Sequence, residues 1–254
     1  MIFILLGARK GSIVATGDTA LVNDTNYLQY NNQSSNINQL DSDELIYTGS
    51  QLTDVDIQSQ HRHKLLHGTR SKKGLVPYNR NKVNQDRGFI KYSIGPEKNI
   101  PIFGVMDGHG EFGHLVASFV QDRLPAALDT QSSLLYSNTE QAIYNAVDSV
   151  VSELHDSSIN AAFSGTTCVF AVLIDNTLYI ANIGDSRCIL GTTVNNQCIP
   201  VQLTNDQKPE VPSEKQRILD AGGRVEPLPG PPGEDCGMYS INNTLLCVVQ
   251  SILY

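Results

Sequence analysis

The chain has 254 residues, with 18 Lys and Arg against 26 Asp and Glu and a formal net charge of −8. This length suits one large domain, or one domain with a tail. The acidic balance argues against nucleic acid as a partner, because polyphosphate backbones bind basic surfaces. The five cysteines are odd in number and form no Cys-x-x-Cys pair, so the sequence indicates neither a zinc site nor a disulfide framework. Reduced thiols favour a cytoplasmic or nuclear protein.

Residues 1–60 are expected to form a low-complexity, disordered tail. Asn, Gln, Ser, Asp and Thr dominate after the first six residues, and the segment carries two Lys or Arg against seven Asp or Glu. Such a segment buries too little apolar surface to offset the entropy of the chain. A structured role in docking a partner is the alternative.

Apolar runs along the chain are all short. The opening stretch Met1–Leu6 is too short for the core of a signal peptide, and no run reaches the roughly 18 apolar residues that cross a membrane. We therefore expect no membrane partner.

A basic stretch covers residues 61–82 and includes Arg80 and Lys82 near its end. Most charge runs of this kind are solvated faces. The alternative is that one or two of these cations line a cleft that binds phosphate.

The most informative stretch of the chain is an apolar run that stops at a carboxylate. A buried strand is predicted from Ile100 to Met106, directly before Asp107, and Gly108 and Gly110 flank His109. A carboxylate, a backbone carbonyl and an imidazole within three residues suit both a hard cation and a proton transfer. A polar turn between a strand and a helix is the plainer alternative.

Helical spacing predicts a helix from His114, which we expect Pro125 to interrupt. Two capping boxes predict the starts of two further helices, at Asn138–Gln141 and at Ser213–Gln216. The glycines 222 and 223 are expected to end the last helix.

Two regions are rich in predicted strands. Residues 84–93 alternate weakly and could pair with the strand before Asp107, which would bring Asp86 to the same edge as Asp107. The second half of the chain contains four nearly continuous apolar strands joined by short turns: Thr167–Ile174, Thr177–Ile183, Arg187–Leu190 and Cys198–Leu203. Continuous apolar strands of this kind are covered on both faces.

Polar residues stand at the ends of apolar strands in three places. These are Asp86, the Asp107–His109 turn and the Gly184–Arg187 turn, which contains Asp185. Each alone is more typical of a turn than of a site. Together they suggest a carboxylate cluster at one rim of a sandwich, and crowded carboxylates require a cation such as Mg²⁺ or Mn²⁺.

Five ordered blocks of this sequence resemble the metal-dependent type 2C protein serine/threonine phosphatases. The blocks are Asn84–Asp86, Phe103–Gly110, Ser164–Thr167, Ala181–Arg187 and Leu203–Pro209. The resemblance covers about residues 80–237 and implies an α+β fold, the four-layer α-β-β-α sandwich of these enzymes. It also implies a binuclear centre of Mg²⁺ or Mn²⁺ at one rim and a phosphoprotein substrate.

The resemblance assigns roles to individual residues. Asp107 would bridge two metals, and the Gly108 carbonyl would be a ligand of one of them. Asp86 would be a further ligand or would hold metal-bound water, and Asp185 matches a position that can hold a third, weaker metal. His109 would protonate the leaving seryl or threonyl oxygen. A water bridging the metals would attack phosphorus in line, without a phosphoenzyme.

Three positions depart from the family pattern. The phosphate-binding arginine of the family falls between Arg80 and Lys82, which we take as the candidate phosphate ligands. Gln85 stands where many members have a glutamate ligand, and Gln207 stands where histidine is usual.

The resemblance ends at Gly237, whereas the family continues with further strands and metal carboxylates. Residues 238–254 match none of this and contain no Asp or Glu. We therefore divide the chain into a tail (1–60), a partial catalytic domain (61–237) and a divergent tail (238–254), and expect a truncated sandwich, incomplete on its C-terminal side. Two functions remain: a monomeric metal-dependent protein phosphatase, or a catalytically weak or inactive phosphatase-like fragment that acts as a binding or regulatory module. For this chain we expect low activity or none.

Overall fold

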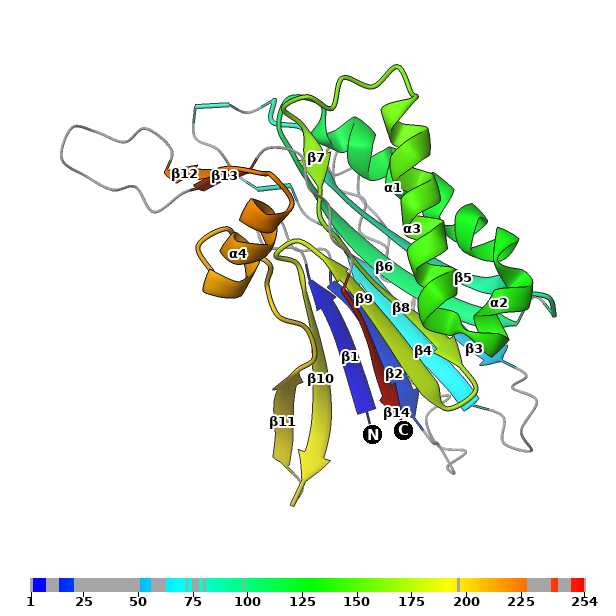
Figure 1. The fold of residues 1–254 in the computed structure, drawn as a ribbon. Coiled ribbons are helices and arrows are strands. Elements are labelled where there is room, and N and C mark those ends of the chain that lie inside the picture. The colour runs from blue at the N-terminus through cyan, green and yellow to red at the C-terminus, as the bar shows by residue number, and fades with distance from the viewer. Residues whose placement is uncertain are drawn as a thin grey trace.

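In the computed structural model, the described residues are 2–7, 14–20, 51–55, 63–71, 73–74, 78–79, 81–97, 99–195, 197–227, 239–241 and 248–253. They form two six-stranded antiparallel sheets and a small two-stranded sheet, and three of the four helices pack together on one side (Figure 1). This arrangement confirms the expected α+β class.

The sheet that carries the candidate site has the strand order β14-β9-β8-β6-β5, with β7 pairing to the end of β6. Its strands are β5 (Asp86–Ile94), β6 (Ile100–His109), β7 (Gly165–Thr166), β8 (Cys168–Ile174), β9 (Thr177–Ile183) and β14 (Val248–Leu253). Strands β6, β8 and β9 contain the apolar runs that the sequence singles out. The polar residues at their ends consequently come to the edge of the sheet rather than to its centre.

Three helices cover one face of this sheet: α1 (Gly113–Thr130), α2 (Ser132–Ser137) and α3 (Thr139–His155) (Figure 1). The core between them and the sheet includes the fully buried Met106, Leu128, Ile143 and Phe170. Burying side chains of this size stabilises a fold by about 1.5–3 kcal/mol each. This layer therefore fixes β6, whose end carries Asp107.

The helix boundaries test two predictions. The Asn138 side chain accepts a hydrogen bond from the Gln141 backbone N–H at 3.1 Å, which confirms the predicted cap of α3. The prediction that Pro125 interrupts its helix is wrong, because α1 continues through it to Thr130. Pro125 is itself buried between the buried Leu124 and Leu128, so packing against the sheet outweighs the lost backbone hydrogen bond.

The second sheet has the strand order β11-β10-β1-β2-β4-β3. Its strands are β1 (Ile2–Gly7), β2 (Val14–Ala20), β3 (Gln51–Val55), β4 (His63–Arg70), β10 (Arg187–Val194) and β11 (Gln197–Gln202). Strand β1 contacts β6 and β8, and β2 contacts β6, so the two sheets face each other. Helices and two sheets thus make three of the four expected layers in the described part of the chain.

A second apolar cluster, which includes Val105, Val169, Ile180, Cys188 and Leu203, joins strands of both sheets. Burial raises the pKa of the Cys188 thiol to about 12. The thiol is therefore protonated and unreactive at neutral pH. Cys168 and Cys188, both buried, are reduced thiols, as the sequence predicts.

Strands β1, β2 and β3 all lie inside residues 1–60, where the sequence predicted a disordered tail. For residues 2–7, 14–20 and 51–55 that prediction is wrong. Strand β1 is an apolar run that pairs with β10 on one side and with β2 on the other, and this pairing gives the partly polar β2 a backbone partner. The rest of the segment lies outside the described residues.

Helix α4 (Pro212–Asp220) lies beside β12 (Val225–Pro227), which pairs with β13 (Tyr239–Ile241). The predicted capping box at Ser213 is wrong: Val211 is the cap, without a side-chain hydrogen bond, because Pro212 with its fixed φ already begins the helix. Gly222, at φ +77°, follows the helix end and confirms the predicted stop.

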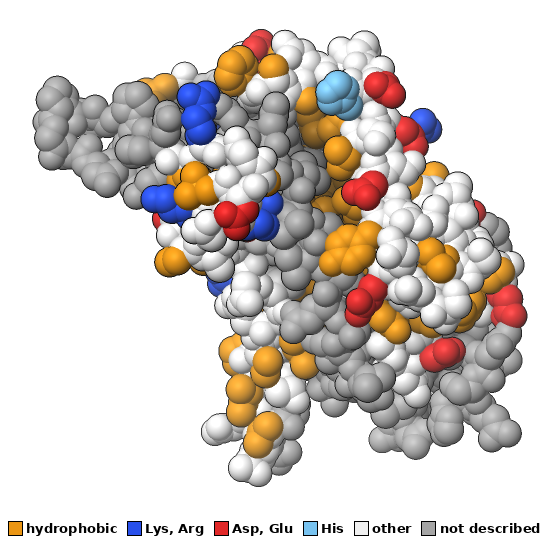
Figure 2. Space-filling model, in the orientation of Figure 1, with side chains coloured by type: hydrophobic (Ala, Val, Ile, Leu, Met, Phe, Trp, Pro, Cys, Tyr) orange, Lys and Arg blue, Asp and Glu red, His pale blue; other side chains and the backbone are white. Residues whose placement is uncertain are grey.

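Charge is unevenly spread over the face shown in Figure 2. Most of its Lys and Arg side chains gather around α4, whereas Asp and Glu are scattered over the helical layer. Among the described residues, no helix is long and apolar enough to cross a membrane.

Candidate metal and phosphate site

Asp86 and Asp107 lie directly opposite each other on neighbouring strands, because the register of β5 and β6 pairs their Cα atoms. Asp86 is only 6% exposed. Burial, the charge of Asp107 and a hydrogen bond to its side chain together raise the pKa of Asp86 to about 6. One buried oxygen, Oδ2 of Asp86, has no hydrogen-bond partner. Two crowded carboxyls with an unpartnered oxygen have the ligand chemistry of a divalent cation.

The turn after Asp107 is too tight for any residue but glycine at position 108. A Cβ added to Gly108 would lie 2.4 Å from the Gly113 carbonyl oxygen and 2.7 Å from that of Gln85. The Gly108 N–H donates to the Gln85 carbonyl at 3.3 Å, and the Gln85 side-chain amide donates to the Gly110 carbonyl at 2.6 Å. Gln85 therefore holds the turn in place, a role that the sequence did not indicate.

His109 is exposed at the rim of the sheet, where it pairs with Gly165 of β7. Its ring lies against this glycine, since a Cβ on Gly165 would be 2.8 Å from Cε1 and 2.9 Å from Nε2. The imidazole is thus supported from one side and accessible from solvent. This placement suits the predicted exchange of a proton with a bound substrate.

Thr167 and Ser186 hold the backbone of Asp107. The Asp107 N–H donates to the Thr167 hydroxyl at 3.0 Å, and the Thr167 N–H donates to the Asp107 carbonyl at 3.0 Å. The Thr167 hydroxyl also bonds to the Ser186 hydroxyl at 2.6 Å, and Ser186 is 1% exposed. Both residues lie in blocks that resemble the phosphatase family, but the sequence predicted no role for either of them. The feature of the sequence that could have indicated their role is a small hydroxyl residue close to a glycine at the end of each of two strands.

Asp185 occupies the turn between β9 and β10, after Gly184 at φ +92°. The turn packs on Thr167, since a Cβ on Gly184 would lie 2.9 Å from its methyl carbon. Across the described residues, no three His, Cys, Asp or Glu side chains gather closely enough to hold a metal. The structure therefore brings Asp86 and Asp107 together but does not bring Asp185 into a cluster with them.

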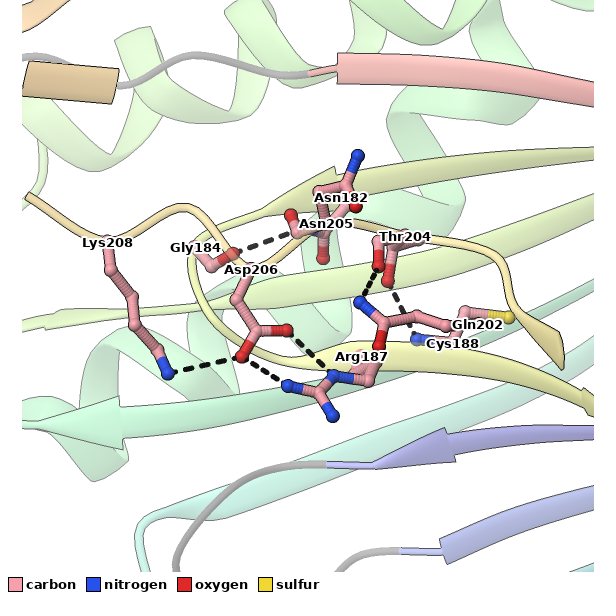
Figure 3. Close-up of polar contacts among 9 residues, drawn as sticks. All are labelled: Asn182, Gly184, Arg187, Cys188, Gln202, Thr204, Asn205, Asp206 and Lys208. Atoms are coloured by element: carbon pink, nitrogen blue, oxygen red, sulfur yellow. Dashed lines mark hydrogen bonds and ion pairs between the residues drawn. The ribbon is translucent and has the colours of Figure 1, made fainter. Parts of the chain in front are cut away.

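Two amide side chains hold the Gly184 turn. The Gln207 side-chain oxygen accepts from the Gly184 N–H at 2.9 Å, and its amide donates to the Asn182 carbonyl at 3.1 Å. The buried Asn182 amide donates to the carbonyls of Gly184 and Asn205 at 3.1 and 3.2 Å (Figure 3). The segment after β11 is thereby fastened to the turn that carries Asp185.

An ion-pair network reinforces this connection. Arg187 donates two hydrogen bonds to the carboxylate of Asp206, at 2.8 and 2.6 Å, and the Lys208 ammonium lies 3.3 Å from the same carboxylate (Figure 3). Burial raises the pKa of Asp206, but the hydrogen bonds from Arg187 and Lys208 outweigh it and lower the pKa overall. The carboxylate is therefore ionised and paired at neutral pH.

The predicted phosphate ligands are only partly described. Arg80 lies outside the described residues. The positive charge of Lys82 offsets part of the rise in the pKa of Asp86, which places this cation in the electrostatic environment of the carboxyl pair.

Comparisons with known proteins agree with the sequence motifs. The family model described as "Protein phosphatase 2C" matches residues 78–238. The chain is 35% identical over 161 residues to "Probable protein phosphatase 2C 35" of Arabidopsis thaliana, covering 63% of this chain and 46% of that protein. It is 34% identical over 195 residues to "Probable protein phosphatase 2C 41" of the same plant, covering 70% of this chain and 53% of the relative.

Among solved structures, the serine-threonine phosphatase 2C of Toxoplasma gondii aligns with a TM-score of 0.49 at 20% identity, over 90% of this chain and 60% of that one. The chain spans about half the length of the curated relatives it matches. The family model nevertheless covers most of the chain and includes every residue of the candidate site. The chain therefore belongs to the protein phosphatase 2C family.

Proposed function

We propose that this chain binds Mg²⁺ or Mn²⁺ through Asp86, Asp107 and the Gly108 carbonyl, and that it hydrolyses phosphoserine and phosphothreonine in protein substrates of the cytoplasm or nucleus. The observation that carries the proposal is the pair of opposed carboxyls, Asp86 and Asp107, with its unpartnered buried oxygen. Membership of the phosphatase family supports the reaction class.

When bound, divalent cations supply a water nucleophile activated near neutral pH and neutralise the phosphoryl oxygens. The residues of the chain transfer the proton and hold the phosphate in place. His109 gives a proton to the leaving seryl or threonyl oxygen from its exposed position at the rim. Lys82 and Arg80 attract the phosphate dianion, and Thr167 fixes the backbone from which Asp107 projects. Asp185 is the candidate for a third, weaker cation.

Calorimetric titration with Mn²⁺, followed by hydrolysis of a phosphoserine peptide, tests this proposal. We expect binding and turnover in the unaltered chain and loss of both in Asp107→Ala. The matched control is Asp122→Ala, which removes an exposed carboxylate of α1 and leaves both unchanged. Absence of turnover in the unaltered chain at millimolar metal would contradict the enzymatic function.

The second candidate is a binding or regulatory module with weak or no activity. The absence, within the described residues, of a third acidic side chain beside Asp86 and Asp107 favours it, because two carboxylates hold a divalent cation weakly. Saturable binding of a phosphopeptide without release of phosphate would support this alternative.

A further inference from the structure

Phe163 is an apolar side chain left in solvent beside the candidate site. It is 93% exposed, more than any other described large side chain that lacks a polar atom. Single exposed apolar residues are common at protein surfaces, but most keep part of their area covered. The position of Phe163 therefore decides whether its exposure has a function.

The loop that carries Phe163 is fixed by hydrogen bonds rather than by its side chain. The Ser164 N–H donates to the Ala161 carbonyl at 3.3 Å, and the Ser164 hydroxyl accepts from the Phe112 N–H at 2.9 Å. The second bond ties the loop to the start of α1. The ring is thus presented on a prearranged backbone, so binding a ligand to it costs little ordering entropy.

The same loop lies against the turn that carries His109. A Cβ on Gly110 would lie 2.2 Å from the Phe163 carbonyl oxygen, so the two backbones are in direct contact. Gly165, two residues after Phe163, supports the ring of His109. Two residues of extended chain span about 7 Å. Phe163 therefore stands one or two residues of an extended peptide away from His109.

A second apolar side chain belongs to the same area. Leu115 is 43% exposed and lies in the first turn of α1, directly after the Phe112–Ser164 connection. The start of α1, which this hydrogen bond ties to the loop of Phe163, therefore adds a partly exposed apolar residue to the rim. Binding sites combine apolar contact area and a few polar groups in this way.

We propose that Phe163 is a specificity-determining residue that binds a bulky apolar side chain next to the phosphorylated residue of a substrate peptide. The proposal rests on the proposed function for the place of the phosphate, but it concerns recognition and not hydrolysis. An exposed aromatic ring on a fixed loop gains contact area when an apolar side chain covers it, and aromatic anchors of this kind dominate peptide and protein interfaces. Phosphopeptides with Gly or Ser at those positions lose this contact.

The experiment measures the binding of two fluorescein-labelled phosphoserine peptides to the 254-residue chain by fluorescence anisotropy in Mn²⁺. One peptide has Leu at the positions flanking phosphoserine, and the other has Ser there. We expect the unaltered chain to bind the Leu peptide about tenfold more tightly, and Phe163→Ala to abolish this preference. Phe163→Leu should retain most of it. The control Tyr144→Ala, at an exposed aromatic residue of α3, should leave the preference unchanged.

Equal affinities of the unaltered chain for both peptides would overturn the proposal, as would a preference that survives Phe163→Ala, or no detectable binding of either peptide by folded protein. Hydrolysis of p-nitrophenyl phosphate, which has no flanking residues, separates this result from the proposed function. If the chain hydrolyses this small substrate but shows no peptide preference, only the role of Phe163 is rejected and the proposed function stands. Peptide preference without turnover leaves Phe163 as a binding residue and rejects catalysis.

Discussion

Asp86 and Asp107 face each other across β5 and β6, and this proximity, together with burial, raises the pKa of Asp86 to about 6. In the absence of a cation, the folded protein holds a proton on this carboxyl at a pH where the unfolded chain, with an Asp pKa near 3.8, has released it. Folding is therefore linked to protonation at this one site.

The first prediction concerns Asp86→Asn in EDTA. A raised folded pKa gives stability that is fully present below pH 3.8 and is lost as the pH rises through about 6. We therefore expect the melting temperature of the unaltered chain to fall, relative to the variant, between pH 4 and pH 7. Scanning calorimetry of both proteins across this range measures the difference. Parallel pH profiles would show that Asp86 is not protonated in the folded state.

The second prediction concerns Thr167→Val, which replaces the hydroxyl with a methyl of similar size. The Asp107 N–H and the buried Ser186 hydroxyl both lose their partner, at a cost of about 1–3 kcal/mol in the free energy of unfolding. We also expect weaker Mn²⁺ binding, because the backbone of Asp107 is no longer held. Urea unfolding and calorimetric titration measure the two effects. Thr167→Ser keeps the hydroxyl, and a loss of equal size in that variant would contradict the role given to the hydrogen bonds.

The third prediction compares two Gly→Ala changes. In Gly108→Ala the new methyl would meet two backbone carbonyl oxygens, which cannot move without opening the turn, so we expect a loss of about 3 kcal/mol or more. Gly222→Ala adds a methyl with no atom within 4 Å, and its cost is limited to the φ of +77°, about 1–2 kcal/mol. Urea unfolding of both variants gives the comparison. Similar losses would mean that the 108–113 turn is looser than the structure indicates.

The fourth prediction concerns Asp206→Asn. The pKa of Asp206 is lowered in the folded protein, so its ion pairs give stability that is present above pH 3.8 and is lost as the pH falls through the lower folded value. We expect the variant to unfold at a lower temperature than the unaltered chain at pH 7, and this difference to shrink as the pH falls below 3.8. Asp220→Asn, an exposed carboxylate of α4, serves as the control and should show no such convergence.

Much of the central sheet can be predicted from the sequence because its strands are apolar runs bounded by turns. The predicted strand Thr177–Ile183 coincides with β9, and the strand that starts at Ile100 is found as β6. The sequence also predicts that Asp86 and Asp107 lie near the same edge of the sheet, and the structure adds the register that pairs them directly. Turn residues on both sides of such an apolar run mark the positions where the strand begins and ends.

The parts that the sequence does not predict depend on contacts between distant residues. Strand β1 is an apolar run and β2 is polar in part, and both pair with strands that lie far away in the sequence, β1 with β10 and β2 with β4. Gln85 and Gln207 form hydrogen bonds to backbone groups of glycine turns. The sequence does not show which backbone group an amide side chain will bind. Resemblance to the family identifies the turns, but only the folded chain shows what holds them.

The pairing of β1 with β10 has a consequence for how the protein folds. Phe3 pairs with Gly191, so β1 cannot complete its pairing until residues far along the chain have been synthesised. Sheets closed by such distant partners form slowly, because a long loop must be ordered before the pairing stabilises it. Until β10 is made, the edge of β1 opposite β2 presents unpaired backbone groups that other chains can bind. Protein yield in cells should therefore depend on the rate of synthesis and on chaperones that shield strands of this kind.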